Sequence, residues 1–107
     1  MKLILAIVND DDAAIVSGAL SKAKFSATKL ATTGGYLKAG NSTFIIGVED
    51  ELVDNAIEII GANARKRTQI IQDTSPYGAI NTMAMPLEIT VGGAIIFVLD
   101  VEQFHKL

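Results

Sequence analysis

The order of apolar patterns along the 107-residue chain predicts an α+β fold with the element order β-α-β-β-α-β. Residues 2–8 are apolar at both alternating sets of positions, which is typical of a strand covered on both faces. Two later segments repeat apolar residues at helical spacing, and residues 25–48 hold two strand-like runs around a glycine-rich loop. This order predicts the ferredoxin-like split β-α-β arrangement, a four-stranded antiparallel sheet with both helices on one face.

The two helices are expected to begin at acidic residues, which suit the positive end of a helix dipole. The first follows Asn9 and opens with the aspartates at 10–12, and the second follows Glu49 and Asp50. The expected apolar stripe of the first helix is Val16, Ala19, Leu20 and Ala23. That of the second helix is Val53, Ala56, Ile57, Ile60 and Ala64.

The remaining strands are expected at residues 25–33, 41–48 and 87–101, with a further strand able to begin within 65–72. Residues 73–86 contain both prolines and predict a long mobile loop. Gly92 and Gly93 interrupt the last strand, and we interpret them as a bulge or a tight backbone approach rather than a hairpin. Residues 1–107 are therefore expected to form a single domain.

The composition of the chain predicts that the protein associates with copies of itself. Half of the residues are apolar and mean hydropathy is +0.38, so one modest core cannot hide all the aliphatic side chains. The doubly apolar first strand needs a cover on the face that the helices leave open.

No signal peptide or bilayer-spanning run is recognisable, so we expect a cytoplasmic protein without membrane insertion. The net charge of −3 disfavours a nucleic-acid polymer as partner.

The residue inventory disfavours an enzyme. The chain has no cysteine, and its single histidine, His105, lies next to the C-terminus, so neither a nucleophilic triad nor a histidine metal site can be assembled. The aspartates at 10–12 are a weak metal candidate, because consecutive side chains in an opening helix point in different directions. We therefore expect no catalytic residue, metal or cofactor.

The segment KLATTGGYLKAGN at residues 29–41 is the candidate ligand site. Its glycines allow backbone N–H groups to approach a phosphate, Tyr36 can stack on a base, and Asn41 supplies an amide. Lys29 and Lys38 are solvated charges or weak phosphate contacts. The alternative from the residues alone is an ordinary hairpin loop with glycines at its turn.

The sequence FSATKLATTGGYLKAGNSTF at residues 25–44, followed by IIGV, resembles the PstA family of PII-like cyclic-di-AMP receptors, and the similarity extends over essentially the whole chain. This resemblance implies a homotrimer with its sheets facing the central axis. It also implies a non-enzymatic signalling protein that binds cyclic-di-AMP between subunits and changes loop order, within 73–86, to signal to an unidentified downstream protein.

The same resemblance implies the ligand-contacting residues. They are Thr28, Gly35, Tyr36, Leu37, Asn41 and Gly47 of one subunit, with Gly92 of the adjoining subunit nearby. Ser26 stands where the family usually has arginine, and Lys24 could partly replace that cation. Two alternatives stay open. One is a trimeric interaction module that has lost the ligand, which Ser26 motivates, and the other is a related PII-like sensor of ATP or another adenine nucleotide.

Overall fold

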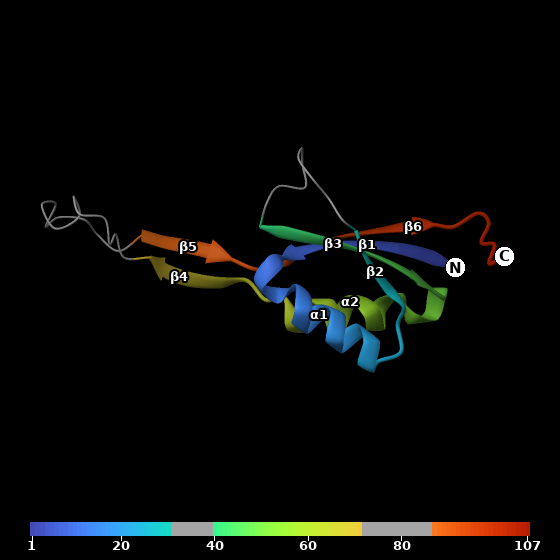
Figure 1. Ribbon diagram of the computed structural model, residues 1–107, viewed down its shortest axis with the longest axis horizontal. Helices are drawn as coiled ribbons and strands as arrows, with labels where there is room; N and C mark the ends of the chain where they lie inside the picture. Colours follow the sequence, from blue (N-terminus) through green and yellow to red (C-terminus); the bar gives the residue numbers. More distant parts are fainter. Residues whose placement is uncertain (31–39, 72–86) are drawn as a thin grey trace, which may run out of the picture.

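The computed structural model describes residues 1–30, 40–71 and 87–107. Within them a four-stranded sheet has the order β2-β3-β1-β6, with every neighbouring pair antiparallel (Figure 1). Its strands are β1 (Lys2–Asn9), β2 (Ala27–Leu30), β3 (Asn41–Val48) and β6 (Ala94–Asp100). The α+β, β-α-β-β-α-β fold expected from the sequence is confirmed. The predictions for Gly35, Tyr36, Leu37 and the 73–86 loop lie outside the described residues.

Both helices cover one face of this sheet, as expected (Figure 1). They are α1 (Asp10–Lys22) and α2 (Val53–Asn63), the latter preceded by the short 3-10 helix η1 (Asp50–Leu52). The core joins β1, β3 and both helices through Ile4, Ala6, Val8, Val16, Leu20, Phe44, Ile46, Val48, Ala56 and Ile60. Ala23 was expected on the buried stripe but is exposed, because α1 ends at Lys22 and Ala23 is its C-cap.

No helix in the described part of the chain is both long and apolar enough to cross a membrane.

A second sheet consists of two antiparallel strands, β4 (Arg67–Ile71) and β5 (Leu87–Val91). Figure 1 shows this ribbon extending away from the four-stranded sheet. The expectation of one interrupted strand at 87–101 is therefore wrong, since β5 and β6 belong to different sheets.

The crossing between the two sheets occurs at Gly92 and Gly93, whose φ angles are 87° and 81°. A Cβ at Gly92 would lie 2.3 Å from the carbonyl oxygen of Arg65, so the expected tight backbone approach is confirmed.

The sheet face opposite the helices is apolar. Strand alternation and register place on it Leu3, Leu5, Ile7, Ile45, Ile95, Phe97 and Leu99, which we call the open face. The β1 members are half-buried, whereas Ile95, Phe97 and Leu99 of β6 are 59%, 53% and 48% exposed. This is the face for which the sequence predicts a cover from outside the chain.

Candidate ligand-binding cleft

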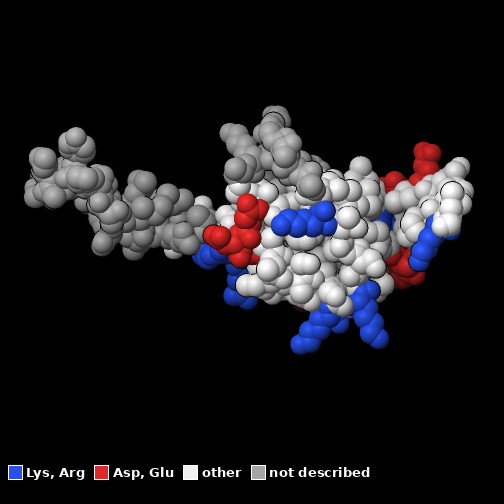
Figure 2. All heavy atoms as spheres, in the orientation of Figure 1, with Lys and Arg blue, Asp and Glu red and all other residues white. Residues whose placement is uncertain are grey.

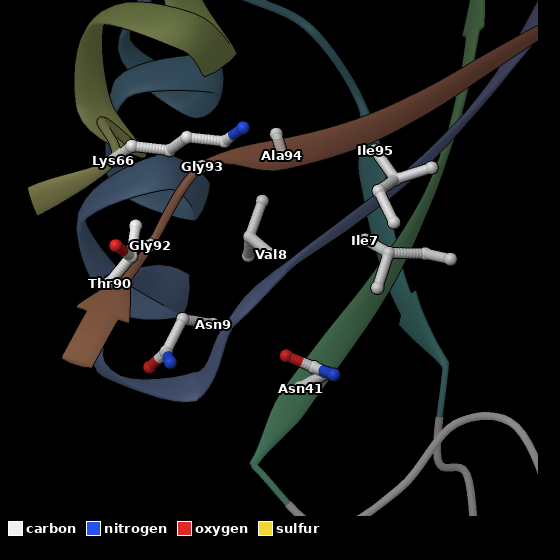
Figure 3. A pocket seen from close by; sticks show the side chains of 10 residues that line it. All are labelled: Ile7, Val8, Asn9, Asn41, Lys66, Thr90, Gly92, Gly93, Ala94 and Ile95. Carbon is white, nitrogen blue, oxygen red and sulfur yellow. The ribbon is translucent and has the colours of Figure 1, made fainter.

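A cleft of about 450 Å³ lies where the ends of β1, β3 and β6 meet the base of the β4–β5 ribbon (Figure 3). It is lined by Ile7, Val8, Asn9, Asn41, Lys66, Thr90, Gly92, Gly93, Ala94 and Ile95. Aliphatic side chains from β1 and β6 provide apolar surface, while two amides, a hydroxyl and an ammonium provide polar groups. The mixture suits a ligand with both an aromatic ring and anionic groups.

The two amides enter the cleft from paired strands. Asn9 ends β1 and Asn41 begins β3, and the register places them directly opposite each other. The side-chain oxygen of Asn9 accepts a hydrogen bond of 2.8 Å from the backbone N–H of Asp11, which caps α1. Asn41 is exposed and can offer both a donor and an acceptor to a ligand.

The ribbon side of the cleft depends on the two crossing glycines. A Cβ at Gly93 would lie 2.9 Å from Cγ of Lys66 and 3.3 Å from its Cε. The absence of a side chain at Gly93 therefore leaves room for the aliphatic part of Lys66, whose amine ends beside Ala94 at the rim (Figure 3). Lys66 lines the cleft, so its ammonium can approach an anion bound there.

The residues expected to contact the ligand fall into two groups within one chain. Asn41 and Gly92 of the same chain line one cleft, whereas the resemblance places Gly92 on the adjoining subunit. Ser26, Thr28 and Gly47 lie at the far end of the β2–β3 pair, because Thr28 pairs with Ile45 and Ala27 with Ile46. Asn41 and Gly47 are at opposite ends of β3 on the same face, roughly 20 Å apart. A single chain thus does not bring the two groups into one pocket.

Lys24 has a structural role at the end of α1. Its φ of 67° is in the left-handed region. The backbone N–H of Lys24 donates to the carbonyl of Ser21 and that of Phe25 donates to the carbonyl of Leu20, both at 2.9 Å. These are the two hydrogen bonds of a Schellman motif, with Lys24 at the position that usually holds glycine. The expectation that Lys24 replaces a phosphate-binding arginine stays a prediction.

The three aspartates that open α1 point to different partners, as the helical geometry requires. Asp10 accepts a hydrogen bond from the hydroxyl of Ser42, and Asp12 is ion-paired with Arg67. Asp11 is exposed. Charged side chains of both signs are visible near the junction of the ribbon with the body of the molecule (Figure 2).

Sequence reasoning missed Asn9, Lys66 and Thr90. Asn9 was interpreted only as the start of a helix, and Lys66 only as the possible start of a strand. Their shared location depends on the crossing at Gly92 and Gly93, which connects the end of β5 to β6, the strand that pairs with β1. The one local signal was the polar residue that ends an otherwise apolar central strand.

A small α+β protein whose cleft combines amides, a cation, an aliphatic surface and a glycine backbone has the groups needed to bind a small anionic ligand. A comparison with protein families identifies the cyclic-di-AMP receptor family, whose model matches residues 1–107. The chain therefore belongs to the family of cyclic-di-AMP receptors, which are non-enzymatic signalling proteins, and the resemblance found in the sequence is confirmed.

The chain is also similar to a solved structure, the crystal structure of a functionally unknown protein from Pediococcus pentosaceus. The sequences are 40% identical, and the match covers 99% of this chain and 96% of the other, with a TM-score of 0.75.

Proposed function

We propose that this protein binds cyclic-di-AMP at the cleft, that neighbouring subunits of a homotrimer complete each site, and that binding changes loop order to signal to a partner protein. One observation supports the location most strongly. Asn41 and Gly92 are far apart in the sequence, and the family resemblance assigns them to one ligand site from two adjoining subunits. In this structure they line one cleft of a single chain.

The chemistry of the cleft suits the parts of cyclic-di-AMP. Asn41 can hydrogen-bond an adenine edge, and Ile7 and Ile95 offer apolar surface to a ring. The ammonium of Lys66 and the backbone around Gly92 can approach phosphate oxygens. Its volume of about 450 Å³ lies within the range of ordinary ligand sites.

The open face supports the subunit arrangement. Ile7 and Ile95 are opposite each other in the register, belong to the open face, and also line the cleft. A second subunit that covers the open face would therefore meet the edge of the cleft. Such a subunit could also bring its own Ser26, Thr28 and Gly47 to the ligand, which one chain cannot do at the same cleft.

The proposal is tested by calorimetric titration of the purified protein with cyclic-di-AMP, cyclic-di-GMP, ATP and AMP. We expect saturable binding of cyclic-di-AMP in preference to the other three, with one ligand per subunit. Preference for ATP or AMP would instead favour an adenine-nucleotide sensor. If none of the four nucleotides binds, the result would favour an interaction module that has lost its ligand, the alternative that Ser26 motivates.

A further inference from the structure

Hydrogen bonds join the first turn of α1 to the start of β3, which forms one wall of the cleft. The backbone N–H of Asp10 donates to the carbonyl of Gly40 at 2.8 Å, and the carboxylate of Asp10 accepts a hydrogen bond from the hydroxyl of Ser42. Gly40 and Ser42 are the two residues that flank Asn41. Asp10 is therefore hydrogen-bonded to the residues on both sides of Asn41, whose side chain lines the cleft.

An ion pair joins the same helical turn to the base of the β4–β5 ribbon, which forms the other wall of the cleft. The side chain of Asp12 is only 7% exposed, and its two carboxylate oxygens lie 3.0 Å from Nη2 and 3.2 Å from Nη1 of Arg67. This two-point contact fixes the guanidinium in orientation as well as distance. Arg67 is the first residue of β4, so the contact sets the position of the ribbon base.

The guanidinium of Arg67 also lies against the other wall of the cleft. Its Nη1 donates to the carbonyl of Arg65 at 3.2 Å, and a Cβ at Gly92 would be 2.7 Å from this nitrogen. A movement of Arg67 would therefore disturb the backbone at Gly92, which lines the cleft. If the Arg67 guanidinium moved away, the buried carboxylate of Asp12 would lose its ion-pair partner, which is unfavourable.

We propose that the first turn of α1 is a positioning element that holds the two walls of the cleft at a fixed separation, Asp10 through β3 and Asp12 through Arg67. Asp10, Asp12 and Arg67 are positioning residues, since none of them lines the cleft. Ribbon placement and cleft shape are consequently coupled through one rigid helical turn. The expected effect on cyclic-di-AMP affinity rests on the proposed function, whereas the expected effect on the ribbon does not.

Two matched controls are available. Asp11→Asn removes a charge from the same helical turn, but Asp11 is exposed and its carboxylate contacts neither wall among the described residues. Lys2→Gln removes a different ion pair, the one with Asp100 at the opposite end of β1. Both controls change charge or pairing without removing a contact between Asp10 and β3 or between Asp12 and Arg67.

The first measurement is amide hydrogen exchange without ligand, followed by mass spectrometry of peptides from β4–β5 and from β1–β3. Arg67→Gln and Asp12→Asn should each accelerate exchange in the ribbon, and Arg67→Lys should do so less. Exchange in β1–β3 of these three variants, and exchange in the ribbon of both controls, should match that of the unmodified protein. Unchanged ribbon exchange in both Arg67→Gln and Asp12→Asn would overturn the positioning role.

The second measurement is calorimetric titration of the same variants with cyclic-di-AMP, at a temperature where each is folded. Each single variant should lose affinity by about tenfold, and the double variant should lose no more than either single one, because both remove the same contact. Faster ribbon exchange with unchanged affinity would refute the coupling to the cleft. If the unmodified protein does not bind cyclic-di-AMP, the proposed function fails, and the exchange data alone still decide whether the element positions the ribbon.

Discussion

Replacing Lys24 by glycine should stabilise the protein. Lys24 has a φ of 67°, a conformation that costs a residue with a β-carbon about 1–2 kcal/mol. Glycine avoids this cost but adds about 0.5–1 kcal/mol of unfolded-state entropy. The net gain in unfolding free energy should therefore be about 0.5–1 kcal/mol. The two Schellman hydrogen bonds use only backbone groups and are retained.

Urea unfolding at a fixed protein concentration measures this difference directly, since the concentration matters for an oligomer. Lys22→Gly is the matched control, because Lys22 is the last helical residue of α1 and glycine there should lower stability, by up to about 1 kcal/mol. Opposite signs for the two variants are expected. A Lys24→Gly variant that is less stable than the unmodified protein would refute the assignment of Lys24 as a helix-ending residue.

The same variant separates two roles for Lys24. If its ammonium substitutes for the arginine that the family usually has at Ser26, cyclic-di-AMP affinity should fall even as stability rises. If Lys66 is the cation nearest the phosphate, affinity should stay unchanged. Calorimetry on the stabilised variant distinguishes these outcomes without the complication of partial unfolding.

Three further predictions concern the binding site, the open face and pH. Ser26→Arg should tighten cyclic-di-AMP binding by about 1–3 kcal/mol and make it more salt-sensitive in calorimetry, and no change in either would show that no phosphate lies beside β2. Phe97→Asp places a charge on the open face and should convert the proposed trimer into smaller species in light scattering. A variant with the same trimer mass as the unmodified protein would exclude this face as the interface. The hydrogen bond to Asp100 raises the pKa of Lys2 above its ordinary value of 10.5. The stability lost in Lys2→Gln should therefore be constant between about pH 7 and pH 10 and vanish as pH rises through the raised value. A pH-independent difference in unfolding free energy would contradict that assignment.

The fold was predictable because its determinants are local and periodic. The apolar residues on both faces of residues 2–8 identified β1, and the return strand at 41–48 matches β3 at both ends. The β5–β6 division was not predictable in the same way, because Gly92 and Gly93 signal a backbone irregularity without saying which sheet follows.

The candidate site was predictable only in part. The resemblance supplied Asn41 and Gly92, but Lys66 joins them through tertiary contacts that no sequence spacing records. The pairing of Asp12 with Arg67 is equally long-range, and the run of acids around Asp12 suggested only helix capping or a weak metal site. Local sequence patterns therefore predicted the helices and strands. The side chains that meet between these elements could be identified only from the structure.

The most direct test of the account is a calorimetric titration of cyclic-di-AMP into the unmodified protein, Asn41→Ala and Asn55→Ala. Asn55 is an exposed amide on α2, away from the cleft, and serves as the matched control. The account predicts that the unmodified protein and Asn55→Ala bind equally. Asn41→Ala should bind more weakly by about 1–3 kcal/mol, the cost of leaving a polar group of the bound ligand without its hydrogen-bond partner. Binding by Asn41→Ala with unchanged affinity would show that the ligand does not occupy the cleft.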